Sequence, residues 1–303
     1  MAWPGRSWLA DYRELLIVLV AAAIGLTVQA PLAAVVRHQG VNILLAVLVF
    51  STGLGIEPKT LRQLPALWRQ LALALVVGIT VLPALSWLAG FLVPAGPLRD
   101  GMITVGLAPC EIASMATTGM AGGSVVLAGG LLIGSTVLTV AASGPILSWE
   151  VQHSSVHPAH IVTNLLLVVA LPLVVALLLR TRVSLSDRAA SVASTTSTLS
   201  VAALVALIAS ETHLELSYLR VVAGLALFLA FTIGVGLLLG RRSKPEVGRA
   251  LLLTTSMRDF AIAASLAATA FGPRAAAPLG LYGIMVLAWG TGSAGFMRAR
   301  GTT

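Results

Sequence analysis

The chain has 303 residues, of which 57% are hydrophobic and only 10% are charged. A water-soluble domain of this length would need more charge on its surface, so the composition indicates a membrane protein. The net charge of +8 comes from 19 Lys and Arg against 11 Asp and Glu. We assign the excess to loops on the cytoplasmic side of a membrane and not to nucleic-acid binding. The single cysteine, Cys110, excludes an intrachain disulfide and a cysteine-rich metal site.

Apolar stretches of about the length that a bilayer requires follow one another along the chain. They predict an all-α, polytopic membrane protein with ten transmembrane helices. The predicted spans are 14–36, 41–56, 68–93, 98–121 and 124–148 in the first half, and 158–180, 189–210, 217–240, 246–271 and 275–297 in the second. No long linker divides the chain, so residues 1–303 are expected to form a single domain.

Lys and Arg are distributed unequally between the two predicted sides of the membrane. With the N-terminus in the cytoplasm, fourteen of the 19 fall on the cytoplasmic side, four on the other, and Arg258 inside a span. Both termini are therefore expected in the cytoplasm. Five helices in each half make the second half an inverted repeat of the first, over about 14–148 and 158–297. Because Arg far outnumbers Lys, as in GC-rich bacterial genomes, the expected location is a bacterial inner membrane.

Two segments about 150 residues apart each place an acid in a run of small, apolar residues. Residues 108–113 read Ala-Pro-Cys-Glu-Ile-Ala, and residues 256–261 read Ser-Met-Arg-Asp-Phe-Ala. Ionisable groups at bilayer depth cost roughly 3 kcal/mol and are tolerated mainly beside a cavity or a partner. Pro109 should break the fourth helix. Paired breaks in two halves mark the binding sites of transporters, so Glu111 and Asp259 are predicted to meet near the middle of the membrane.

The predicted crossover has the chemistry to bind ions. The N-terminus of a half-helix suits an anion, whereas freed carbonyls suit Na⁺ or H⁺. The guanidinium of Arg258 can hold a carboxylate, and we predict that it pairs with Glu111. The principal candidates for substrate or ion binding are Glu111, Ser114, Thr254, Arg258 and Asp259; further candidates are Cys110, Met115, Thr117, Ser135, Thr136 and Ser256. We expect no cofactor and no metal other than Na⁺.

Several motifs along nearly the whole chain resemble those of the bile acid:sodium symporters, within the wider bile/arsenite/riboflavin transporter group. They are Phe50–Ile56, Leu82-Pro83, Pro109–Thr117, Gly122–Ala128, Met257–Ala268, Pro278 and Gly292. The resemblance implies a ten-helix carrier with a panel domain and a core domain. It also implies symport of an organic anion with Na⁺ by alternating access, with broken fourth and ninth helices.

The chain departs from this family at the positions of its sodium ligands. Ser114 matches a family Ser-Asn pair, but Met115 stands in the place of the Asn. Thr254 corresponds to a family Glu and Arg258 to a family Gln, and a third-span Gln falls near residues 78–80. The resemblance therefore implies that the usual sodium sites are dismantled, with Arg258 in roughly the place of a bound cation.

Two couplings and two other functions stay open. Glu111 and Asp259 can carry H⁺ or ligate a rearranged Na⁺ site. Cys110 after Ala-Pro also resembles the arsenite-efflux branch, although that branch has an acid where this chain has Ala261. A channel is the alternative of another class, but no polar residue recurs along one helix face as in a pore. No catalytic constellation points to an enzyme. The expected partners are a small organic anion and the lipid bilayer.

Overall fold

The computed structural model describes residues 5–37, 40–56, 62–150, 158–183, 185–210 and 217–301. This part of the chain is all-helical, with no β-strand, so the predicted fold class is confirmed at that level. The elements are α1 (Gly5–Thr27), α2 (Gln29–Arg37), α3 (Gly40–Gly55), η1 (Leu64–Leu67), α5 (Trp68–Gly90), α6 (Pro97–Leu107), α7 (Ala113–Met120), α8 (Val125–Glu150), α9 (Pro158–Leu165), η2 (Leu166–Ala170), α10 (Leu171–Arg182), α11 (Asp187–Ser210), α12 (Ser217–Gly240), α13 (Pro245–Ser256), α14 (Phe260–Phe271) and α15 (Pro273–Gly301).

Helices occupy each of the ten ranges predicted as spans. By length and composition, six helical stretches are able to cross a membrane: Leu64–Gly90, Val125–Leu147, Ala159–Arg182, Arg188–Ser210, Tyr218–Gly240 and Pro273–Ala299. Shorter apolar helices are Leu16–Thr27, Gly40–Gly55 and Phe260–Phe271. The first predicted span consists of two helices, because α1 ends at Thr27. Pro31 in α2 has no N–H to offer the carbonyl of Thr27, which favours a bend there.

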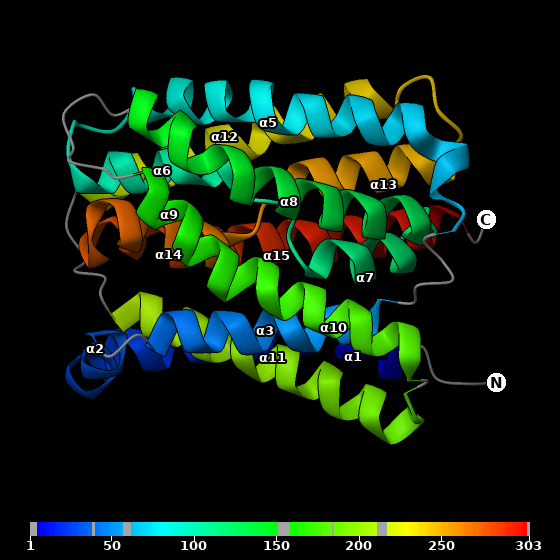
Figure 1. Ribbon diagram of the computed structural model, residues 1–303, viewed down its shortest axis with the longest axis horizontal. Helices are drawn as coiled ribbons and strands as arrows, with labels where there is room; N and C mark the ends of the chain where they lie inside the picture. Colours follow the sequence, from blue (N-terminus) through cyan, green and yellow to red (C-terminus); the bar gives the residue numbers. More distant parts are fainter. Residues whose placement is uncertain are drawn as a thin grey trace.

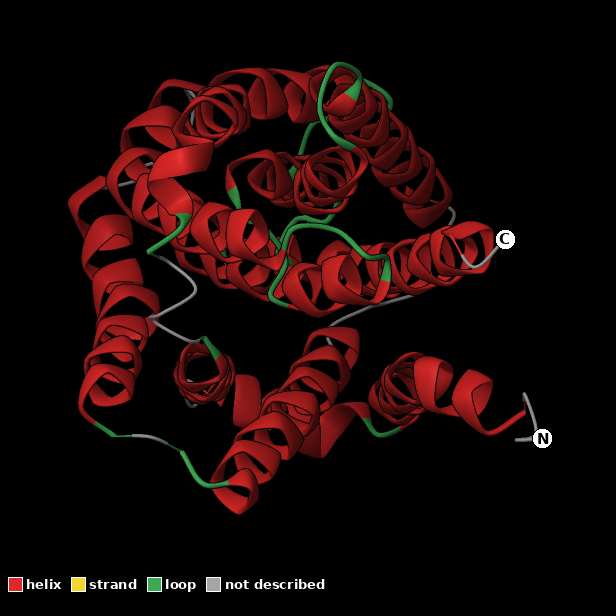
Figure 2. Cartoon of the chain, turned by 90° about the vertical axis from the view of Figure 1, so that its right-hand side faces the viewer, coloured by secondary structure: helices red, strands yellow, loops and turns green. Residues whose placement is uncertain are grey.

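The helices form two groups, which Figures 1 and 2 show one below the other. We call the smaller group, α1, α3, α10 and α11, the panel, and the larger group, α5–α8 and α12–α15, the core. Inside the panel, α11 packs against both α1 and α3. The panel meets the core mainly where α1 and α11 pack against α15. The helix α9–η2–α10 joins the groups, since α9 contacts α8 and α10 contacts α3.

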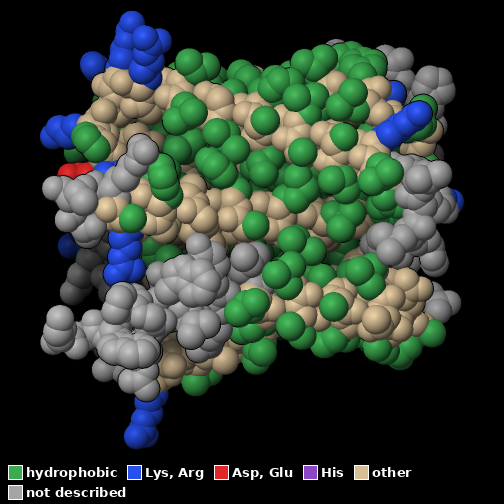
Figure 3. Space-filling view, turned by 180° about the vertical axis from the view of Figure 1, so that it is seen from behind, with side chains coloured by type: hydrophobic (Ala, Val, Ile, Leu, Met, Phe, Trp, Pro, Cys, Tyr) green, Lys and Arg blue, Asp and Glu red, His purple; other side chains and the backbone are tan. Residues whose placement is uncertain are grey.

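Charged and apolar side chains are segregated along the length of the molecule. The face in Figure 3 is covered by hydrophobic side chains in its middle, with Lys and Arg at the two ends. More of these basic side chains lie at the end where α1 begins and α15 ends, which we call the terminal end. An apolar belt between polar ends suits a helical bundle that spans a bilayer.

Two helices of the core are interrupted in the middle of the molecule. The helix α6 ends at Leu107 and α7 begins at Ala113, while α13 ends at Ser256 and α14 begins at Phe260. Both interruptions were predicted from the sequence, the first from Pro109. The connecting segments, residues 108–112 and 257–259, form the crossover where the candidate site lies.

Candidate functional site

The two interruptions pair with each other through their backbones. Cys110 and Arg258 form an antiparallel bridge. The amide of Glu111 donates to the carbonyl of Met257 at 2.8 Å, and the amide of Asp259 donates to that of Pro109 at 2.9 Å. The broken helices free these backbone groups, and a hydrocarbon environment offers them no water. The backbone groups that one break leaves without a helical partner are therefore satisfied by those of the other break.

The bridge directs the predicted site residues to two opposite faces. Residues paired across antiparallel strands project to the same side, and their chain neighbours project to the other. Cys110 and Arg258 thus share one face, the cation face, whereas Glu111 and Asp259 share the other, the acid face. The two carboxyls lie close enough for a direct Coulomb interaction. The predicted convergence of the acids is present in the structure.

Both acids bind the N-terminus of α14. Asp259 is its N-cap, with Oδ1 accepting a hydrogen bond from the amide of Ile262 at 2.8 Å. Oε2 of Glu111 accepts from the amide of Phe260 at 3.3 Å. The two side chains are 1% and 2% exposed. The start of a helix carries unpaired N–H groups and partial positive charge, so buried carboxylates are favourable there.

Glu111 also lies at the start of the other half-helix. Its carboxyl is next to the amides of Ile112 and Ala113, where α7 begins. The N-cap residue of α7 is Ile112, whose side chain makes no capping hydrogen bond. We call this group of amides from α7 and α14 the amide cradle. Its occupant in the structure is the carboxyl of Glu111.

Arg258 does not form the ion pair with Glu111 that we predicted. Its guanidinium donates to the carbonyl of Ala108, and its Nε has no hydrogen-bond partner among the described atoms. The reason is the register of the bridge, which sends the two side chains to opposite faces. Arg258 is 4% exposed and lies deep in the core.

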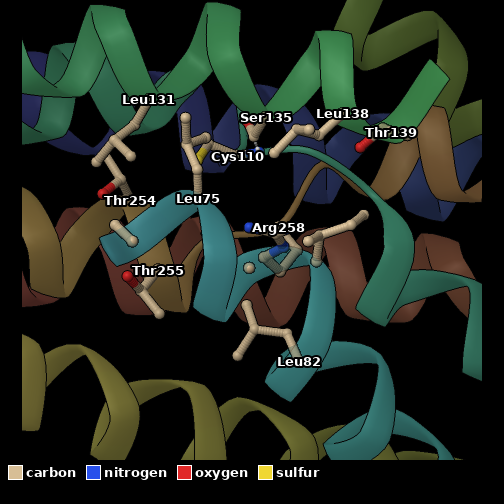
Figure 4. Close-up of a pocket in the computed structure, with 13 residues that line it drawn as sticks. Leu75, Leu82, Cys110, Leu131, Ser135, Leu138, Thr139, Thr254, Thr255 and Arg258 are labelled. Carbon is tan, nitrogen blue, oxygen red and sulfur yellow. Dashed lines mark hydrogen bonds between the residues drawn. The ribbon is translucent and has the colours of Figure 1, made fainter. Parts of the chain in front are cut away.

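The cation face borders a cavity of about 20 Å³, large enough for about one water molecule. Figure 4 shows Arg258 and Cys110 there, with Ser135 above them on α8 and Thr254 and Thr255 on α13. Gly78 of α5 lines the same cavity, and a Cβ on it would lie 3.9 Å from a guanidinium nitrogen of Arg258. Arg258 therefore fills the space that a longer third-span side chain would enter.

Most of the predicted hydroxyl ligands bind the backbone of their own helices, which lowers their availability for an ion. Thr117, Thr136, Thr254 and Ser256 donate to carbonyls four residues earlier, at 3.0, 2.7, 2.6 and 2.7 Å. Ser135 accepts from the amide of Cys110 at 3.1 Å and so holds the crossover in place.

Ser114 differs from these residues. Its side chain is fully buried at the start of α7, and its Oγ has no hydrogen-bond partner among the described atoms. Asp259 Oδ2 is likewise without one. Each of these atoms retains hydrogen-bonding capacity beside the amide cradle.

A larger cavity, of about 410 Å³, lies between panel and core next to the acid face. Glu111 and Met115 form part of its core wall, while Ser51 and Thr52 from α3 and Ser194 from α11 form part of its panel wall. Glu111 is the single ionisable side chain among the described lining residues. The cavity lies towards the terminal end, where α3 ends and α11 begins. The remaining lining is mostly apolar, as in many small-molecule sites.

At the opposite end, panel and core are joined by a polar cluster, which we call the latch. Asn164 of α9 donates to Thr269 of α14 at 3.0 Å, and Ser265 of α14 donates to Asn42 of α3 at 3.0 Å. Asn42 also donates to Asn164 at 3.4 Å. The groups are thus hydrogen-bonded at one end and separated by a cavity at the other.

Residues 42–220 match the family model of the Sodium Bile acid symporter family. The chain belongs to this family. Members of the sodium bile acid symporter family are membrane transporters and not enzymes, so the chain is a multi-pass membrane protein of that transporter family. No match was found among the curated proteins.

The sequence analysis did not predict two features of the site, Tyr282 and the latch. Tyr282 of α15 is fully buried beside the crossover, near enough to interact electrostatically with Arg258 and Glu111, and its hydroxyl has no hydrogen-bond partner among the described atoms. Nothing distinguishes this Tyr from a core aromatic in the sequence. The latch carried a signal, since Asn42 and Asn164 each stand in an apolar run.

Proposed function

We propose that the protein is a proton-coupled symporter that moves an organic anion across the membrane by alternating access. The observation that carries this proposal is the position of Glu111, a buried carboxyl at the crossover of two broken helices and on the wall of the large cavity. A carboxyl can take up a proton from one side and release it to the other when the cavity changes sides. The core crossover is the substrate and ion site, with Glu111, Asp259 and Ser114 on it.

Arg258 favours H⁺ over Na⁺ as the coupling ion. Its fixed positive charge borders the small cavity that also contains Thr254 and Gly78. A sodium ion beside a buried guanidinium would be repelled strongly, because the interior screens charges poorly. Three of the hydroxyls that line it, those of Ser135, Thr139 and Thr254, already donate to backbone carbonyls. Arg258 therefore takes the place of a bound cation, and the coupling proton is carried by Glu111 on the acid face.

The arrangement of cavity and latch supports alternating access. All ten helical ranges cross the membrane in this proposal, with 14–148 and 158–297 as inverted repeats and both termini in the cytoplasm of a bacterium. The 410 Å³ cavity then opens towards the cytoplasm, and the latch closes the outer side. Transport requires the panel to move against the core so that the latch opens and the cavity closes.

Uptake into proteoliposomes tests this function. The purified protein is reconstituted, and uptake of radiolabelled cholate and 4-phenylbutyrate is followed in sodium-free buffer, with and without an inward proton gradient. We expect uphill uptake that the gradient drives and that added Na⁺ does not change. Glu111→Gln should abolish the gradient-driven part. The matched control is Glu246→Gln, which removes an exposed acid at the start of α13 and should transport normally. Strict dependence on Na⁺ without any effect of pH would contradict the proposal.

A further inference from the structure

The amide cradle is built for one negative charge. It collects the N-terminal amides of two half-helices, α7 and α14, around the carboxyl of Glu111. The same amides are suited to the carboxylate of another molecule, since helix N-termini and their dipoles attract anions regardless of their source. The wall of the large cavity includes Glu111, Ile112 and Ala113, so a molecule in that cavity lies against the cradle.

The charges around the crossover balance only when a single ionised carboxylate besides that of Asp259 is bound there. With Glu111, Asp259 and Arg258 all ionised, the three side chains sum to one negative charge. The two half-helix N-termini together contribute roughly +1 elementary charge. A substrate anion added to this arrangement would leave an uncompensated negative charge in a buried site, which is strongly unfavourable. One proton restores the balance.

We propose that the carboxylate of the transported anion replaces that of Glu111 on the amide cradle, and that Glu111 takes up one proton as it is displaced. The inference deepens the proposed function and rests on it. Water in the cavity supplies the proton to a Glu111 oxygen, and the neutral carboxyl can then donate a hydrogen bond to the bound anion. The proton leaves when the anion dissociates and Glu111 returns to the amides. Binding and proton uptake are thus one event, with a stoichiometry of one to one.

The surroundings of Glu111 single it out as the group that titrates. Asp259 faces it and stays bound to the amide of Ile262 as the cap of α14. Tyr282 faces it from α15, and Cys110 and Arg258 project to the cation face. From α1, α3 and α11, the described cavity-lining residues include no charged or titratable side chain. The apolar lining and its Ser and Thr hydroxyls suit a monocarboxylate with an apolar body and a few polar groups.

Binding measured as a function of pH tests this exchange in the full chain in detergent. The probes are the choline salts of cholate and 4-phenylbutyrate, with 4-phenylbutyramide as the uncharged control, measured by titration calorimetry. In the wild type the Kd of a carboxylate should rise about tenfold per pH unit on the alkaline side, because binding takes up one proton. In Glu111→Gln the Kd should be independent of pH. The amide should bind weakly at every pH.

Two controls keep the outcomes distinct. Glu246→Gln, which removes an exposed acid away from the crossover, should retain the pH dependence. Proton uptake by the wild type, followed with a pH-sensitive dye in weak buffer, decides the stoichiometry without any variant. The inference is overturned if no carboxylate binds more tightly at lower pH, if the pH dependence survives in Glu111→Gln, or if the amide binds as well as the acid. Proton-linked binding without uphill uptake into vesicles would remove the symport function and leave the exchange intact.

Discussion

The two faces of the crossover use charge in opposite ways. On the cation face, Arg258 lies beside a cavity of about 20 Å³ that no organic molecule can enter. On the acid face, Glu111 lies on the wall of a cavity of about 410 Å³. One backbone bridge separates the two charged side chains. In the proposed cycle the charge of Arg258 is therefore fixed, whereas that of Glu111 is exchanged for the charge of the substrate.

The largest effect is expected when the positive charge of Arg258 is removed, because the proposed difference between the two faces depends on it. Arg258→Gln leaves the crossover with an additional net negative charge and opens space between Gly78 and Thr254. We expect proton-driven uptake to fall by more than tenfold, since buried uncompensated charge disturbs the site. We also expect Na⁺ to stabilise this variant against heat, whereas K⁺ should not, because a small cation can then enter the cation face.

Thermal unfolding in NaCl and KCl, with the wild type as the control, measures this effect. The wild type should show the same Tm in both salts. A variant that transports normally and responds to neither salt would show that Arg258 is a packing residue with no part in the balance of charge.

The sequence predicted the crossover but not its two faces. Apolar length placed the helices, and Pro109 with the acids at positions 111 and 259 placed the breaks, because these signals are local. The motif comparison aligned Glu111 with Asp259. In the structure the segments run antiparallel, so Glu111 lies opposite Met257. A shift of one residue in such a pairing moves every side chain to the other face, and only tertiary packing sets the register. The predicted pair with Arg258 failed for this reason.

A smaller effect, on the free energy of unfolding, should distinguish the role of Asp259 from that of Glu111. Asp259→Ala removes the cap of α14 and leaves the buried amide of Ile262 without its acceptor. The free energy of unfolding should fall by about 1–2 kcal/mol, whereas Asp259→Asn should cost a few tenths. Denaturant titration in detergent measures both. Equal losses in the two variants would mean that the charge of Asp259, and not its hydrogen bond, stabilises the crossover.

The latch provides a test at the other end of the molecule. Asn164→Ala removes hydrogen bonds that join α9 to α3 and α14. At about 1 kcal/mol net, the loss should shift the population roughly fivefold towards the state with the outer side open. In a Cys110→Ala background, a cysteine introduced at Ser194 reports on the large cavity. Maleimide should modify it more slowly when Asn164 is also replaced, by up to about fivefold, because the rate follows the fraction of molecules with the cavity open. An unchanged rate would mean that the latch does not hold the outer side closed.

Cys110→Ala should have the smallest effect, because the thiol belongs to the face that substrate does not reach. Its side chain is 3% exposed and borders the small cavity with Ser135, while its backbone amide, which the substitution retains, makes the hydrogen bond to Ser135. We expect anion uptake within about twofold of the wild type, since a buried Cys acts mainly as a small apolar side chain. Arsenite flux in the same vesicles is the sharper measurement. If the wild type moved arsenite and Cys110→Ala did not, a thiol on the cation face would be in contact with substrate, and the separation of a fixed face from a transporting face would be wrong.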